Sequence, residues 1–300
     1  MRQDPLGNQG RPRRRRGGGG GLRVLVLLGL AVYGGCYYFG NRTVDPYTGE
    51  KVLIDRSLDA EDEKALGLEA YRQILAQERP VAADAQVAQQ IRGIAQRLIA
   101  RVDAVETALA AEHGRPPGHF SRSFDWEVTV LQSEQANAFC LPGGKIAVYT
   151  GLVPVARNAD AMAVVMGHEI AHALLRHGAQ RMAQQKLSGI GQMVGAAGGM
   201  DAQQQELLMS AFGYGYLLPY ARSHEVQADE VGLMLAAAAC FDPRQAVPLW
   251  ERMSAASGGQ APPEFASTHP NPGTRIQNLQ ALMPKAMAYR QRFCESAQPR

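Results

Sequence analysis

The chain has 300 residues, of which 46% are hydrophobic and 20% charged, and its formal net charge at pH 7 is +3. This length allows one domain of about 230 residues with appendages at its ends. Charge is close to balanced, and the one basic cluster leads straight into an apolar run. We therefore expect no nucleic-acid partner.

The N-terminus combines a basic cluster, a glycine spacer and an apolar run. The arginines of the cluster are Arg11, Arg13, Arg14, Arg15, Arg16 and Arg23. Basic residues before an apolar run favour a cytoplasmic N-terminus, here residues 1–21. The apolar run, 24–39, is long for a signal-peptide core and slightly short for a spanning helix. Residues 22–40 are expected to be a signal anchor or, alternatively, a lipoprotein signal acylated at Cys36.

Residues 41–60 are expected to form a linker, 61–290 the main domain and 291–300 a tail. Apolar periodicity predicts amphipathic helices over 60–77 and 82–102. Alternation predicts strands over 124–130 and 145–150, the second after a Pro-Gly-Gly turn. Strands followed by further helices predict an α+β fold, mostly helical with a small antiparallel sheet.

The motif HExxH occupies His168 to His172 within an apolar, proline-free stretch predicted to be helical from 158 to about 186. Histidines at i and i+4 project from one face, as a metal site requires, and Glu169 leans toward the same cleft. Glu225, on a later helix, would complete a site with three ligands and one open position. That arrangement is typical of catalytic zinc. Strands that precede such a two-helix metal site predict a zincin-like fold.

Two residues near Glu225 are assigned from helical geometry. Asp229 lies one turn further on the same face, where a carboxylate can hold the second ring nitrogen of a ligand histidine. His224 points about 100° away from Glu225 on a helix and is interpreted as a bystander.

Residues 187–219 contain five glycines in 189–199, and each weakens a helix by about 1 kcal/mol. The segment is therefore predicted to be irregular, and its mobility would gate the cleft. The alternative is a helical hairpin of small residues packed closely against the core.

The four cysteines show no CxxC pair and no zinc-finger spacing. In an oxidising compartment Cys240 and Cys294 are candidates for a disulfide, although spacing does not fix the pairing. Cys140 is interpreted as a small packed hydrophobe.

Taken together, these segments resemble the M48 family of zinc metallopeptidases, of the bacterial periplasmic Oma1/BepA-like type. Besides HExxH and Glu225-x-x-Ala-Asp229, the resemblance rests on residues 45–49, 137–146 and 267–276 and covers about 45–285. It implies a substrate-binding edge strand at Asn137, Ala138 and Phe139. It also implies His269 as an oxyanion donor or removable fourth ligand, and Arg275 as a neighbour of the site. Because the sequence ends at Arg300, we expect no tetratricopeptide repeat domain after it.

The expected function is zinc-dependent cleavage of unfolded or misassembled polypeptides in envelope quality control. One Zn²⁺ per chain would be held by His168, His172 and Glu225, with Glu169 as general base. The catalytic domain is expected on the periplasmic side of a bacterial inner membrane. The alternatives are a catalytically silent zincin-fold chaperone or adaptor, and a zincin that acts on a non-protein substrate.

Overall fold

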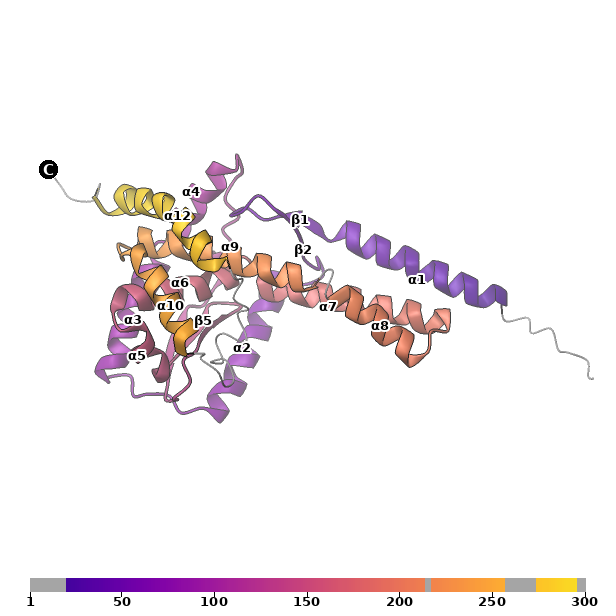
Figure 1. The fold of residues 1–300 in the computed structure, drawn as a ribbon, viewed down its shortest axis with the longest axis horizontal. Helices are drawn as coiled ribbons and strands as arrows, with labels where there is room; N and C mark the ends of the chain where they lie inside the picture. Colours follow the sequence, from indigo (N-terminus) through magenta and orange to yellow (C-terminus); the bar gives the residue numbers. More distant parts are fainter. Residues whose placement is uncertain (1–19, 214–216, 257–273, 296–300) are drawn as a thin grey trace, which may run out of the picture.

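The computed structural model describes residues 20–213, 217–256 and 274–295. It consists of a globular domain and a long arm that projects from it (Figure 1). We call the arm the three helices α1 (Gly20–Gly40), α7 (His177–Gly198) and α8 (Ala202–Phe212). The domain is mostly helical, so the predicted α+β class is confirmed.

The main sheet has three strands, β3 (Glu127–Leu131), β4 (Ala138–Leu141) and β5 (Lys145–Tyr149), in the order β3-β5-β4. β4 and β5 are antiparallel, as expected for the small sheet. β3 and β5 are parallel, with Glu127 opposite Lys145, so the sheet is mixed. All five residues of β5 are buried, as befits the central strand, and β4 lies at an edge.

The first helices of the domain follow their sequence signals. α2 (Ala60–Gln77) begins at a capping box, in which the Asp59 carboxylate accepts from the Asp62 N–H and the Asp62 carboxylate accepts from the Asp59 N–H. The helix predicted over 82–102 is shorter at both ends in the structure, where α3 covers Gln86–Ile99. A separate helix, α4 (Val102–Glu112), begins at the predicted C-terminal end. Residues 41–60, expected to be a linker, include the antiparallel hairpin of β1 (Arg42–Val44) and β2 (Lys51–Leu53).

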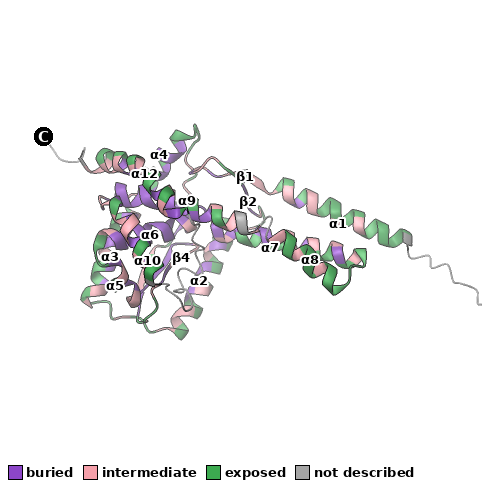
Figure 2. Cartoon of the chain, in the orientation of Figure 1, coloured by how far each residue is buried: buried purple, intermediate pink, exposed green. Residues whose placement is uncertain are grey.

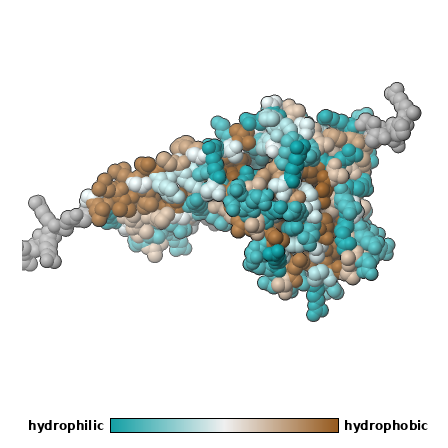
Figure 3. All heavy atoms as spheres, turned by 180° about the vertical axis from the view of Figure 1, so that it is seen from behind, coloured by the Kyte–Doolittle hydropathy of each residue, from teal (hydrophilic) through white to brown (hydrophobic). Residues whose placement is uncertain are grey.

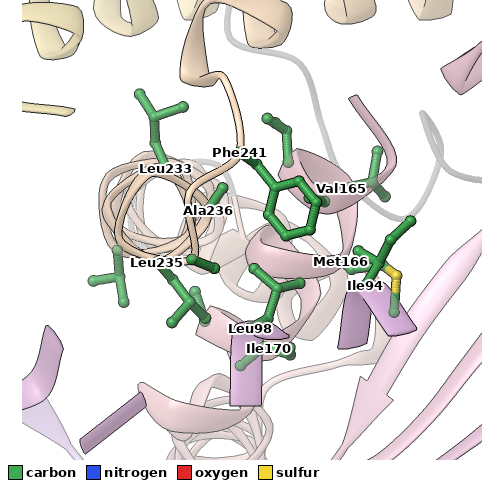
Figure 4. Packing of buried hydrophobic residues seen from close by; sticks show 14 of the residues in the cluster. Ile94, Leu98, Val165, Met166, Ile170, Leu233, Leu235, Ala236 and Phe241 are labelled. Carbon is green, nitrogen blue, oxygen red and sulfur yellow. The ribbon is translucent and has the colours of Figure 1, made fainter. Parts of the chain in front are cut away.

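The core lies where α6 (Ala159–Leu174) is enclosed by α3 and by α9 (Leu218–Ala238). Figure 4 shows Ile94 and Leu98 of α3, Val165 and Ile170 of α6, and residues of α9 meeting there. In Figure 2 the buried residues concentrate in this part of the molecule, whereas the arm is mainly exposed or half-buried. Burial of these side chains is the main source of the domain's stability.

The helix predicted from 158 to about 186 is wrong at its C-terminal end. α6 stops at Leu174, and Arg176 has a left-handed backbone with φ of 55° before α7 begins at His177. The Arg176 guanidinium forms an ion pair with the buried Glu63 carboxylate of α2 and lies over the Phe120 ring. These contacts fix the turn, so the chain leaves α6 in a new direction.

Residues 187–219 are helical over most of their length, so the irregular segment predicted for them is wrong. α7 continues to Gly198, and α8 returns antiparallel to it after a left-handed Gly199. A helical hairpin was the alternative expectation. This hairpin, however, packs along α1 and projects away from the core instead of covering it (Figure 1).

Several short helices complete the domain. They are η1 (Phe120–Ser123), η2 (Thr150–Leu152), α5 (Val153–Ala156), η4 (Pro243–Gln245), α10 (Ala246–Ala256), α12 (Arg275–Arg290) and η5 (Gln291–Glu295). A disulfide joins Cys240, just after α9, to Cys294 in η5, with 5.7 Å between the two Cα atoms. It ties the C-terminal helix to the end of α9.

Candidate metal centre

The HExxH motif lies in the most deeply buried helix of the domain. Asn158 caps α6 by accepting a hydrogen bond from the Ala161 N–H, and nearly every later residue of the helix is buried. His168 and Glu169 are only 2% and 3% exposed. An apolar helix held on all sides keeps these polar side chains in fixed orientations.

α9 crosses α6 at two glycines. A Cβ atom on Gly232 would lie 2.6 Å from the backbone nitrogen of His168, and one on Gly167 would lie 2.7 Å from the carbonyl oxygen of Gly232. Both distances are shorter than a carbon atom tolerates, so the crossing requires glycine on both helices. This close approach brings Glu225 of α9 to the histidines of α6.

Three ligand-type atoms converge at the crossing. His168 Nε2 lies 3.1 Å from His172 Nε2 and 3.3 Å from Glu225 Oε2. His172 Nε2 lies 3.5 Å from Glu225 Oε1. With ligand bonds of about 2.0 Å, the edge of a tetrahedron around zinc is about 3.3 Å. The spacing and the donor types therefore fit a zinc ion.

The His168 ring is oriented by the acid one turn beyond Glu225. His168 Nδ1 lies 2.9 Å from Asp229 Oδ1, which fixes an N–H on Nδ1 and makes Nε2 the nitrogen that can hold a metal ion. Arg275, 1% exposed, donates to Asp229 over 2.6 Å and to Glu225 over 3.4 Å. Its guanidinium carbon lies 3.3 Å from the centre of the Trp250 ring. Arg275 thus holds both carboxylates against α6.

The His172 ring is oriented by a relay that the sequence patterns do not indicate. The Gln227 amide donates to Glu50 over 2.7 Å, so its oxygen is left to accept from His177 Nε2 at 3.0 Å. His177 Nδ1 must then be the acceptor for His172 Nδ1–H, 2.7 Å away. This leaves the lone pair of His172 Nε2 facing His168 and Glu225.

The pKa values of His177 and His224 agree with a neutral relay, whereas His168 behaves differently. Burial lowers the pKa of His177 well below its ordinary value of 6.5, and repulsion from His224 lowers it further. Burial likewise lowers the pKa of His224 to about 3. For His168 burial also lowers the pKa, but hydrogen bonds to Asp229 and Glu225 outweigh it and raise the pKa to about 9. The two carboxylates therefore attract positive charge to this place, and a metal cation would satisfy them as a proton does.

The other predicted site residues fall in different places. His224 lies outside the three-ligand group and stacks on His177, with ring centroids 4.0 Å apart. Asp229 and Arg275 lie in the site, although HExxH alone did not indicate how they would meet. His269 lies outside the described residues. Nothing in the motif pointed to His177 or Gln227, because their roles depend on the turn at Arg176.

The predicted edge segment lies beside the site. Asn137 precedes β4, Ala138 and Phe139 begin it, and β4 packs against α6. A cavity of about 260 Å³ lies between α2, the end of β4 and the start of α7. His172 lines it together with Cys140 and Leu141, and the His172 side chain is 11% exposed against 2% for His168. The site is therefore open on the His172 side.

Comparison with known proteins places the chain in a family. The sequence profile described as Peptidase family M48 matches residues 96–283. The chain belongs to this family. It is 34% identical over 263 residues to the mitochondrial metalloendopeptidase OMA1 of Schizosaccharomyces pombe, covering 86% of this chain and 71% of the relative.

Two further relatives are covered over a smaller share of their length. The Saccharomyces cerevisiae mitochondrial metalloendopeptidase OMA1 is 37% identical over 57% of this chain and 51% of its own length. The Escherichia coli beta-barrel assembly-enhancing protease is 29% identical over 66% of this chain and 39% of its own length. With the family and the His-His-Glu group, the chain is a metalloendopeptidase.

Proposed function

We propose that this peptidase is zinc-dependent and cleaves unfolded or misassembled polypeptides at the periplasmic side of a bacterial inner membrane. The observation that carries the proposal is the convergence of His168, His172 and Glu225, whose ligand-type atoms all lie within 4.8 Å of one another. Both imidazoles turn Nε2 toward this point, and at His168 a bound cation would take the place of the proton that Asp229 and Glu225 attract. Such a donor set, with two nitrogens and one carboxylate, is typical of catalytic zinc.

The catalytic roles follow from the positions of the side chains. A zinc ion at this point would polarise the scissile carbonyl and acidify water. Glu169, next to His168 on α6, is assigned to take the proton of the attacking water and pass it to the leaving amine. Asp229, Arg275 and His177 hold the ligands in place. The assignment of His269 to the oxyanion remains a sequence-based proposal.

The proposed substrate class rests on the sheet edge beside the site. Within the part of the chain that the structure describes, β4 pairs with β5 alone, so its other edge has no strand partner. An extended polypeptide can bond to such an edge through its main chain, with little demand on its sequence. This favours unfolded chains over one fixed motif. The printed name of the Escherichia coli relative, an assembly-enhancing protease, also favours a role in envelope quality control.

The proposed location rests on α1. Residues Gly21–Gly40 form a helix long and apolar enough to cross a membrane. Only 6% of the most apolar 18-residue stretch of this helix is buried inside the structure. The arginines that precede it favour a cytoplasmic N-terminus. The Cys240–Cys294 disulfide favours an oxidising compartment, on the side of the membrane opposite to the cytoplasm, for the catalytic domain. Acylation at Cys36 is the alternative anchor, and the intact mass of membrane-extracted protein distinguishes cleavage and acylation from an uncleaved helix.

The test of the catalytic assignment separates proton transfer from metal binding. Glu169→Gln should lose about 10²-fold or more of the cleavage rate on casein, an unfolded protein, while its zinc content stays the same. Glu225→Ala should lose activity and one bound zinc per chain. Glu61→Gln, at an exposed residue of α2, is the control. Wild-type cleavage by Glu169→Gln would overturn the assignment, and activity lost equally in the control would point to misfolding.

A further inference from the structure

The arm exposes apolar side chains outside α1 as well as within it. On the α7–α8 hairpin, Leu207 is 72% exposed, Met193 49%, Leu208 41% and Met200 39%. Figure 3 shows strongly hydrophobic residues at the outer end of the arm, next to the grey N-terminal residues, with mixed polar and apolar residues beside them. Soluble surfaces rarely keep contiguous apolar patches of this kind without a partner. Something other than water is therefore expected around the hairpin.

α7 runs antiparallel to α1 along nearly its whole apolar length. Near the domain, the Tyr37 hydroxyl lies 3.5 Å from the carbonyl oxygen of Ala183. Further out, a Cβ atom on Gly34 would lie 3.2 Å from Ile190. Near the tip, Arg23 Nε donates to the carbonyl oxygen of Ala197 over 2.7 Å.

These three contacts fix the position of α7 along the axis of α1. The side chain of Leu27 approaches Gly198, so Met193 lies level with the middle of α1. α8 returns at the same level, because Leu208 approaches Gly195. A bilayer that contains the middle of α1 must therefore also meet the middle of the hairpin.

The charges of α7 and of the turn after it lie only at the two ends of that segment. Near the domain, Lys186 forms an ion pair with Asp55 over 2.6 Å. At the tip, Asp201 is exposed, at the end of the arm where Arg23 lies, and α8 carries one more exposed charge, Glu206, beyond the tip. Between Lys186 and Asp201, α7 and the turn after it contain no charged residue. Charges at both ends of an uncharged band match the two polar boundaries of a bilayer.

We infer that the α7–α8 hairpin inserts into the bilayer beside α1, with its tip among the headgroups of the leaflet that holds the N-terminal end of α1. The partner of the exposed apolar face is thus lipid. This inference rests on the proposed membrane anchor, and it adds a second membrane element. Because α7 follows the HExxH helix and α8 leads to the Glu225 helix, both ligand-bearing helices are joined through a membrane-embedded hairpin.

The test measures the depth of single fluorescent labels. In a Cys36→Ser, Cys140→Ser background that keeps the disulfide, one cysteine is introduced by Val32→Cys, Met193→Cys, Leu207→Cys or Leu66→Cys. Each is labelled with a polarity-sensitive fluorophore and placed in nanodiscs of phosphatidylethanolamine and phosphatidylglycerol. Quencher lipids carry a doxyl group near the middle of the acyl chain. Val32 reports α1, and Leu66, 49% exposed on α2, is the matched control on the domain.

The labels at Val32, Met193 and Leu207 are expected to lose emission in the presence of the quencher lipids. The emission of the label at Leu66 is expected to stay unchanged. Quenching at Val32 with water-like emission at Met193 and Leu207 would overturn the inference and leave the anchor intact. Emission unchanged at all positions would overturn the anchor and the hairpin together. A wild-type circular dichroism spectrum shows that each labelled variant is folded, and Leu208→Cys replaces either hairpin site if its variant does not fold.

Discussion

Glycines in two regions of this protein have opposite meanings. At the crossing of α6 and α9, Gly167 and Gly232 let two backbones touch, and a methyl group on either would clash with the other helix. In α7, a Cβ atom on Gly189 or Gly191 would meet nothing within 4 Å. The first pair is a packing requirement of the metal centre. The second pair lies in the arm at positions where an added methyl group would have no neighbour.

The contrast extends to burial. α6 hides almost every side chain, including the charged ones, whereas the arm exposes leucines and methionines (Figure 2). A domain in water must bury apolar groups, and a charge it buries must have partners. Exposed apolar groups are stable where the surroundings are apolar. If the arm lies in a bilayer as inferred above, the two regions differ in their solvent, and each prediction below tests one of the two regions.

Gly232→Ala should have the largest effect. The added methyl group must push α9 away from the His168 backbone, and a displacement of about 1 Å at a catalytic site costs about 10²-fold in rate. Casein cleavage and zinc affinity should both fall. Circular dichroism checks that the variant remains helical. Unchanged kinetics would show that the crossing is looser than described and would remove the basis of the contrast.

Asp45→Asn should stabilise the protein at neutral pH. Burial raises the pKa of Asp45 from 3.8 to about 6, although hydrogen bonds from the Thr48 and Tyr47 backbone and the Thr48 hydroxyl lower it. The pKa of Asp45 is higher in the folded than in the unfolded protein. Its contribution to the free energy of unfolding is therefore fully present below about pH 4 and is lost as the pH rises through 6. Above pH 6 the charged form costs up to about 3 kcal/mol, since 2.2 pKa units at about 1.4 kcal/mol each separate the two states.

Asparagine keeps the oxygen that accepts these hydrogen bonds and carries no charge. Urea midpoints at pH 7.5 should therefore be higher for Asp45→Asn than for wild type, and the difference should shrink toward pH 4. Asp84→Asn, at an exposed residue, is the control. An advantage that does not change with pH would show that the carboxyl group is not the cause.

His177→Ala should weaken zinc binding by about 10- to 100-fold, as loss of a group that orients a ligand usually does. Without it the His172 ring loses the acceptor for its Nδ1–H, 2.7 Å away. His177→Gln, which restores an acceptor oxygen, should recover part of the affinity. Competition with a chelator measures it, and His113→Ala, at an exposed histidine, is the control. A merely structural role would not be rescued by glutamine.

The metal centre was largely predictable because its residues follow a fixed spacing. HExxH lies on one helical face, and Asp229 follows Glu225 by one turn, so the rules of a single helix place them. The relay through His177 was not predictable, because it needs the left-handed turn at Arg176 and the ion pair that fixes it. Residues 187–219 were misjudged for another reason. Glycine content lowers helix propensity in water, but tertiary contact with α1 overrides it.

Gly189→Ala should have the smallest effect and gives the sharpest contrast with Gly232→Ala. Both changes add one methyl group to a helix, but at Gly189 the methyl group meets no neighbour, so only helix propensity changes. Alanine is favoured over glycine by up to about 1 kcal/mol, so α7 should become slightly more stable. Cleavage and zinc content should stay at the wild-type level. Hydrogen exchange of the α7 amides measures the local stabilisation. If Gly189→Ala instead impaired cleavage as Gly232→Ala is expected to, a close contact at Gly189 would be required, and the arm would be packed as tightly as the metal centre.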